Sequence, residues 1–415
     1  MRPFAMSAAP ELHFGAGSAE SLHKLIRDRG WRSVLLVISR SALVQPEIQR
    51  GLLAALDSAG ISHRTYRYDR APDGLDPFTA PRGPYREPAP AVVDAIAELE
   101  HPERAGLDNG ASAEAVVAIG GGSALDTGKA LSAALKHPHP ISHYLEGVGT
   151  EKPTGAKIPF VAVPTTAGTG TEATKNAVLS EVGVDGFKKS LRHERFIPDI
   201  AVVDPLLQML CPPEVTAASG MDAIAQLLEA YISTGANPLT DALALDGLAS
   251  AGQSYIRVVE RGESDVDARA GMAYAAYLSG LCLANAGLGV VHGLAGPAGA
   301  HSAAPHGAFC GILLAPASEM LVERLVRRRD SAGTLGKLAA AGRVLTGRGA
   351  ASTEAHIQML LDRLSEFARI GGLPGLHSYG FTESVVRQVA REGDSKSCPV
   401  SFDESERAEL LNRCL

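Results

Sequence analysis

The hydrophobic positions follow two different patterns that divide the chain near its middle. In the first half, short unbroken apolar runs alternate with amphipathic stretches. Unbroken runs are typical of parallel strands buried on both faces, and the amphipathic stretches are typical of helices. Strands are expected at 12–14, 33–38, 115–119, 159–164 and 200–205, and helices at 19–29, 45–58 and 91–99. This alternation predicts an α/β domain with a parallel sheet.

From Pro213 onward the pattern changes to long alanine- and leucine-rich segments with apolar residues at helical spacing. Helices are expected at 214–231, 241–259, 265–283 and 353–370. We place the domain boundary near Pro205, with an α/β domain over 1–205 and an all-helical domain over 206–415.

Two stretches of the first domain carry no helical or strand pattern. Residues 70–90 contain six prolines and two glycines, a density of breakers that no regular element tolerates. Residues 103–112 read as a second, polar loop.

The apolar run 115–119 leads directly into Gly120–Gly122 and then into helix-compatible sequence. Glycines allow the close approaches that a Cβ would block, and Ser123 is expected to cap the helix that follows. The free N–H groups at a helix start, with the positive end of the helix dipole, form an anion site. Phosphate is therefore the first ligand to expect here.

Two common phosphate motifs do not fit this turn. A Walker loop needs Ser or Thr after Gly-Lys, but Ala130 follows Lys129. The third glycine of the dinucleotide fingerprint would fall on Leu125. The turn instead continues into a polar set at successive i, i+3 positions, made of Ser123, Asp126 and Lys129.

The composition of the chain argues against several classes of binding partner and of structural site. The formal net charge of the chain is −7, so no basic surface for nucleic acid or for a membrane is expected. No apolar run approaches the length of a membrane span, and residues 1–6 lack the apolar core of a signal peptide. The five cysteines form no Cys-x-x-Cys pair, which argues against a disulfide framework and against a zinc-thiolate site. We expect a cytoplasmic protein.

Residues 120–129, Gly-Gly-Gly-Ser-x-x-Asp-x-x-Lys, resemble the signature of the iron-containing (group III) alcohol dehydrogenases. The superfamily of these enzymes includes glycerol dehydrogenase and dehydroquinate synthase. Residues 164–172, Pro-Thr-Thr-Ala-Gly-Thr-Gly-Thr-Glu, match a second family motif. The resemblance implies a dehydroquinate synthase-like fold, in which a Rossmann-like NAD(P)-binding domain precedes an all-helical metal and substrate domain. It also marks residues 70–90 as an insertion.

The resemblance implies a nicotinamide cofactor. The positions that match the family's cofactor-binding residues are Gly121, Gly122, Ser123, Asp126, Thr165, Thr166, Thr169 and Lys188. Many relatives place an acidic residue after the strand at 33–38, where it would bind the ribose and repel a 2′-phosphate. This chain has Ser39 and Arg40 there, so both NAD and NADP are expected candidates.

The second half holds residue types that bind metals. Hydride transfer to a carbonyl leaves charge on its oxygen, which a divalent cation held by imidazoles and a carboxylate can stabilise. Asp222 and Gln226 are four apart on a predicted helix, and His292 and His306 each lie beside glycine or proline. The resemblance implies Asp222, His292 and His306 as ligands of iron or zinc.

Two positions depart from the family. Gln226 stands where relatives have a histidine ligand, and Gly296 stands where they have a further histidine. An amide oxygen is a poorer ligand for Fe²⁺ than an imidazole, so zinc is expected to bind more readily than iron. His301 is a candidate proton relay in place of the missing histidine.

These features predict a metal-dependent NAD(P) alcohol dehydrogenase or aldehyde reductase that acts on a small alcohol or aldehyde. We expect a homodimer, with no nucleic acid or membrane partner. The alternatives are a dehydroquinate synthase-like lyase, a metal-free reductase of the same fold and a cofactor-binding protein without catalysis. The lyase would need basic residues around the metal, and the only ones between Asp222 and His306 are Arg257, Arg261 and Arg269, away from the histidine motifs.

Overall fold

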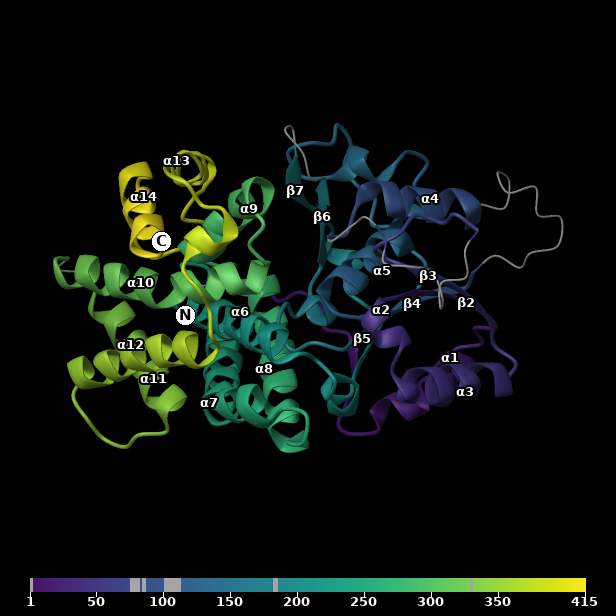
Figure 1. Ribbon diagram of the computed structural model, residues 1–415, viewed down its shortest axis with the longest axis horizontal. Coiled ribbons are helices and arrows are strands. Elements are labelled where there is room, and N and C mark those ends of the chain that lie inside the picture. The colour runs from purple at the N-terminus through teal and green to yellow at the C-terminus, as the bar shows by residue number, and fades with distance from the viewer. Residues whose placement is uncertain (1–2, 75–82, 84–86, 101–112, 182–185, 329–330) are drawn as a thin grey trace. The chain divides into compact units, whose positions relative to one another are not determined.

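The computed structural model describes residues 3–74, 83, 87–100, 113–181, 186–328 and 331–415. The chain divides into two compact units. The α/β unit is made of Ala8–Thr166 and Thr171–Leu210, and the helical unit is made of Met1–Ser7, Ala167–Gly170 and Cys211–Leu415. A parallel sheet with covering helices precedes a unit made of helices (Figure 1), which confirms the predicted fold class.

The described part of the α/β unit is built on a six-stranded sheet. The strands, in spatial order, are β1 (Glu11–Phe14), β8 (Ile200–Val203), β5 (Phe160–Pro164), β4 (Ala115–Gly120), β2 (Ser33–Ile38) and β3 (Ser62–Arg67). All neighbouring pairs are parallel. Every residue of β2, β4, β5 and β8 is buried, which explains why these strands appear in the sequence as unbroken apolar runs.

Helices cover both faces of this sheet (Figure 1). One face, with Leu35 and Val116, packs against α4 (Pro90–Glu100) and α5 (Gly122–Ala134). The other face, with Leu36 and Val117, packs against α1 (Leu22–Asp28), η2 (Glu47–Leu53) and α3 (Ala54–Ser58). The shorter elements are η1 (Ser18–Ser21), α2 (Arg40–Leu43), η3 (Ile141–Tyr144), η4 (Thr171–Ala173), η5 (Glu194–Phe196) and η6 (Pro205–Gln208).

The helical unit is organised around α6 (Pro213–Ile232), in which every residue from Gly220 to Ile232 is buried. The remaining elements are α7 (Pro238–Arg261), α8 (Val266–Ala286), α9 (Val290–His301), α10 (His306–Val326), α11 (Ala332–Thr346), α12 (Thr353–Ile370), η7 (Leu376–Tyr379), α13 (Glu383–Glu392) and α14 (Glu404–Arg413). Within the described ranges no single helix has the length and hydropathy of a membrane span. Helices α8 and α9 have them only when taken together, and the pair is bent by 99° at the break between them.

Two expectations about helices were wrong. The segment 45–58 is not one α-helix, because π-helical turns over η2 precede the short α3. Ser123 does not cap α5. The cap position is Gly121, which has an extended backbone and no side-chain cap bond, and α5 begins at Gly122.

Three strands were not expected. Strand β3 lies at the edge of the sheet and is only partly buried, so its sequence Ser-His-Arg-Thr-Tyr-Arg lacks an apolar run. Strands β6 (Asn176–Glu181) and β7 (Phe187–Arg192) form a separate antiparallel pair. Between Arg70 and Pro90, the described residues 70–74, 83 and 87–89 carry no helix or strand. The rest of that stretch and the predicted loop at 103–112 lie outside the described residues.

Gly128 sets how closely α5 approaches the sheet, and this close approach generates a prediction. A Cβ at Gly128 would lie 2.6 Å from the Cβ of Ala118 and 3.0 Å from the Phe160 ring. Overpacking of this kind costs about 1–3 kcal/mol, whereas Ala gains roughly 1 kcal/mol over Gly in a helix. Gly128→Ala should therefore lower the unfolding temperature. Gly336→Ala on α11, where a Cβ meets no atom within 4 Å, should leave it equal or higher; equal shifts in both variants would contradict the packing argument.

Candidate active site

In the α/β unit, the glycine turn at the end of β4 lies against the threonine segment that follows β5. A Cβ at Gly121 would lie 3.2 Å from Thr166 Oγ1, and the Thr165 N–H donates to the Gly120 carbonyl at 2.9 Å. Gly120 itself has φ +156°, and a Cβ there would lie 2.7 Å from that of Ala124. The turn thus brings together five of the predicted cofactor residues, namely Gly121, Gly122, Ser123, Thr165 and Thr166.

Asp126 and Lys129, the charged residues of the polar set on α5, are buried rather than exposed to solvent. The Lys129 ammonium donates to the carbonyls of Thr171 at 2.8 Å and Thr174 at 2.7 Å, so this lysine ties the loop after the threonine segment to α5. Burial raises the pKa of Asp126 to about 7, although Lys129 counteracts it. Burial likewise raises the pKa of Glu172 to about 7.

The last two predicted cofactor residues come from other segments, although Lys188 is near enough to Asp126 to counteract the rise of its pKa. Lys188 is on β7, and its ammonium donates to Glu87 at 3.0 Å, so it already has an acidic partner within the α/β unit. Thr169 lies in the segment Ala167–Gly170, which belongs to the helical unit.

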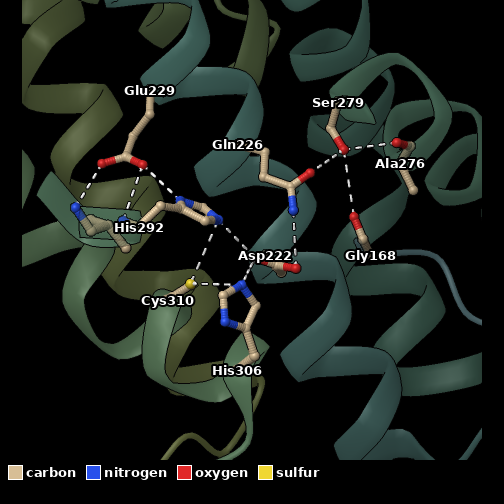
Figure 2. Close-up of polar contacts among 10 residues, drawn as sticks. Gly168, Asp222, Gln226, Glu229, Ala276, Ser279, His292, His306 and Cys310 are labelled. Carbon is tan, nitrogen blue, oxygen red and sulfur yellow. Dashed lines mark hydrogen bonds and ion pairs between the residues drawn. The ribbon is translucent and has the colours of Figure 1, made fainter. Parts of the chain in front are cut away.

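In the helical unit, three helices bring four potential metal ligands together (Figure 2). Asp222 comes from α6, His292 from α9, and His306 and Cys310 from α10. One ligand atom of each lies within 4.8 Å of the others. Asp222 Oδ1 lies 3.2 Å from His292 Nε2 and 3.6 Å from His306 Nε2. Three of the four predicted metal ligands are thus brought together.

Cys310 was not predicted as part of this group. Its Sγ lies 3.7 Å from His292 Nε2 and 3.8 Å from His306 Nε2. The signal was present in the sequence, because Cys310 follows His306 by four residues on one helix, the same spacing that singled out Asp222 and Gln226.

The ionisable side chains of the group shift one another's pKa values. Burial alone would lower the pKa of His292, but Cys310, Asp222 and Glu229 outweigh it and hold this pKa well above 6.5. Burial would raise the pKa of Asp222, but His306 and His292 lower it. Burial raises the pKa of the Cys310 thiol to about 11. The ionised Asp222 carboxylate and the raised pKa of His292 show that positive charge is stabilised at this place.

Glu229 orients His292. Its carboxylate accepts from His292 Nδ1 at 2.7 Å and from the Val291 N–H at 2.8 Å. Because the carboxylate can only accept, Nδ1 carries a proton in this bond, and Nε2 is the ring nitrogen that faces Asp222 and Cys310 (Figure 2). A carboxylate–histidine pair of this kind fixes the tautomer of a metal ligand and makes it more basic.

Gln226 lies beside the group but its oxygen is turned away. Its Nε2 donates to Asp222 Oδ2 at 3.1 Å, and its Oε1 accepts from the Ser279 hydroxyl at 2.7 Å (Figure 2). The carboxylate of Asp222 can only accept, so the amide nitrogen must face it. In the structure Gln226 thus contacts Asp222 but is not one of the four potential ligands that converge.

The other two positions of interest are at and near the end of α9. His301 pairs with Glu392 of α13 through Nε2, at 2.7 Å, and it is outside both the cluster and the described lining of the pocket next to it. A Cβ at Gly296 would meet no atom within 4 Å, so open space remains where relatives have a histidine.

A pocket of about 300 Å³ reaches the cluster through Asp222 and His306. Val215, Ala218 and Leu373 form part of its wall, and a pocket of this size and apolar character suits a small organic ligand. His306 is the most accessible of the clustered side chains, at 31% exposure. A ligand in the pocket would thus reach the cluster on the side of Asp222 and His306.

Two family models match the chain. The model described as iron-containing alcohol dehydrogenase matches residues 91–205, and its C-terminal counterpart matches residues 216–411. The chain is 31% identical to the NAD-dependent methanol dehydrogenase of Bacillus methanolicus, over 84% of this chain and 86% of that protein. It is 33% identical to the 1,3-propanediol dehydrogenase of Citrobacter freundii, over 72% and 75%.

A solved structure of a 1,3-propanediol oxidoreductase superimposes on the whole chain. The TM-score is 0.81, the sequence identity is 27%, and the coverage is 100% of both chains.

The hydrogen bonds of Glu229 generate a prediction about ligand orientation. Glu229→Ala removes the acceptor of His292 Nδ1 and of the Val291 N–H, so the imidazole is no longer fixed. We expect metal affinity to fall about 10–100-fold, the usual effect of losing such a partner, measured by competition with a chelator. Glu229→Gln keeps an acceptor oxygen and should lose less affinity; an equal loss in both variants would show that the charge of Glu229 matters rather than its acceptor.

Proposed function

Because the chain belongs to the iron-containing alcohol dehydrogenase family, we propose that Asp222, His292 and His306 hold its metal. The chain is an alcohol dehydrogenase, which transfers hydride between a nicotinamide and a small alcohol or carbonyl compound. The convergence of the ligand atoms of these three residues within 4.8 Å at the end of a pocket carries this proposal. A bound divalent metal would act as a Lewis acid toward the substrate oxygen. Asp222 would supply the negative charge that holds the metal, and Glu229 would keep the imidazole of His292 oriented toward it.

For the cofactor, we assign the pyrophosphate to the turn Gly121–Ser123, with Thr165 and Thr166 beside it. The support is the start of α5, where no side chain caps the first turn and a Cβ at Gly121 would press on Thr166. N–H groups at such a helix start bind phosphate. Thr169, Lys188 and Asp126 are assigned to the same cofactor on the family resemblance alone.

NADP is proposed as an alternative to NAD. Ser39 caps α2 by accepting from the Ala42 N–H at 3.1 Å, and Arg40 is exposed. An arginine without a competing carboxylate at this position tolerates a 2′-phosphate. We further assign residues 1–205 to cofactor binding and 206–415 to metal and substrate binding, in a cytoplasmic homodimer.

The pocket favours an uncharged substrate over a phosphorylated one. No lysine or arginine occurs among the described residues that line it, whereas a dehydroquinate synthase-like lyase would need cations for its phosphate. The polar side chains of the lining include those of Ser219, Tyr379 and Thr169. They suit hydroxyl or carbonyl groups.

The cofactor assignment predicts the effect of Gly121→Val. The backbone of Gly121 is extended, at φ −75°, so the backbone conformation itself admits valine, although the Cβ would press on Thr166. Its side chain would fill the space at the turn, and NAD(P)H binding should weaken more than tenfold, about 1.4 kcal/mol or more, in a fluorescence titration. Gly336→Val on α11 is the control for a bulky residue at a glycine. Unchanged binding in folded Gly121→Val would refute the assignment of the turn.

The metal assignment predicts the loss of both metal and turnover in His306→Ala. His63→Ala, a histidine of the α/β unit paired with Asp57, should retain both. The wild-type protein should bind zinc more readily than ferrous iron, as elemental analysis after competition between the two ions would show. Full NAD(P)H-dependent turnover in metal-free His306→Ala would instead establish a metal-free reductase.

A further inference from the structure

We propose that Cys310 is the fourth protein ligand of this metal, in place of the histidine that Gln226 replaces. The proposal rests on the proposed function, since it concerns the same metal. It gives the chain an Asp-His-His-Cys site made of Asp222, His292, His306 and Cys310. Gln226 then supports Asp222 from outside this set of ligands.

The four distances that join Asp222 and Cys310 to the two imidazoles are close to those of one tetrahedral ion. Zinc bonds of 2.0–2.1 Å to nitrogen or oxygen and 2.3 Å to sulfur place nitrogen and oxygen ligands ~3.4 Å apart, and sulfur and nitrogen ~3.6 Å apart. Asp222 Oδ1 lies 3.2 and 3.6 Å from the two imidazole nitrogens. Cys310 Sγ lies 3.7 and 3.8 Å from the same nitrogens. Each of these four distances therefore differs from its tetrahedral value by only a few tenths of an ångström.

The surroundings of the Cys310 thiol are those of a metal ligand and differ from those of a cysteine that only packs in the core. Cys310 is fully buried, as many structural cysteines are, but its sulfur faces two imidazole nitrogens and a carboxylate rather than an apolar wall. Cys282, also fully buried, instead directs its thiol at the Thr240 carbonyl, 3.6 Å away. Cys282 is therefore the matched control.

A thiolate ligand changes the charge of the site. When the metal–sulfur bond forms, the thiol proton passes to solvent, and no electron is transferred. A divalent ion with Asp222 and a thiolate is formally neutral, whereas the family's set of one aspartate and three histidines leaves a charge of plus one. The softer donor favours zinc over ferrous iron. The lower charge weakens the Lewis acid, so an alcohol that enters as a fifth ligand should ionise at higher pH.

The test is the spectrum of the cobalt-substituted protein. Wild-type protein and Cys282→Ser should show a thiolate-to-cobalt charge-transfer band in the near ultraviolet, and Cys310→Ser should lack it. X-ray absorption of the zinc protein should show one sulfur at about 2.3 Å. The zinc dissociation constant of Cys310→Ser should rise more than about 100-fold, beyond the effect of an outer-shell partner. Adding Gln226→His to Cys310→Ala should restore much of the affinity, because it returns an imidazole four residues after Asp222.

The wild-type cobalt spectrum decides the proposal even if Cys310→Ser does not fold. A wild-type protein that binds metal through His306 but shows no sulfur in either spectrum overturns the role of Cys310 and leaves the proposed function intact. If neither the wild type nor any variant binds a divalent metal while turnover persists, both the Cys310 proposal and the metal assignment fail.

Discussion

The candidate metal centre depends on one buried acid, Glu229, which links α6 to the start of α9. Its carboxylate takes the N–H of Val291 and the Nδ1–H of His292, and Gly289 at the cap position has no side chain for this task. A buried carboxylate is costly unless its hydrogen bonds are satisfied. The same bonds that satisfy Glu229 therefore start α9 and orient an imidazole, and helix packing and ligand geometry cannot change independently.

A buried lysine has a comparable structural role in the α/β unit. Lys129 is fully buried, and carbonyls of Thr171, Thr174 and Asn176 accept from its ammonium. Burying an ammonium is tolerated only with such partners, so the loop after the threonine segment must adopt one conformation. Together with the close approach of Gly128 to Ala118, this places the glycine turn and the threonines at fixed positions. The geometry of the proposed phosphate site is thus a consequence of the packing beneath it.

Complete burial made four of the five predicted strands recognisable in the sequence, whereas the mostly exposed edge strand β1 was predicted with the help of the glycine turn that follows it. Strands β2, β4, β5 and β8 are buried on both faces and appear as apolar runs, whereas the edge strand β3 and the pair β6–β7 mix polar and apolar residues and were missed. At the site, residue type and motif predict Asp222, His292 and His306. They do not predict the orientation of the Gln226 amide, which depends on Ser279 from another helix. The spacing of Cys310 from His306 was visible in the sequence, but the approach of its thiol to His292 depends on how α9 and α10 pack.

The two departures from the family pattern have different physical consequences. Gly296 leaves open space, so the loss of a histidine there is not compensated by a neighbouring side chain. The Gln226 amide is hydrogen-bonded to both Asp222 and Ser279. The fourth position around the proposed metal is therefore open to a residue of α10. That residue is Cys310. A change on α6 and a thiol on α10 thus act as one alteration, in which the number of ligands is conserved while their charge and softness change. An altered metal preference then follows from the ligand atoms themselves, with the fold around them unchanged.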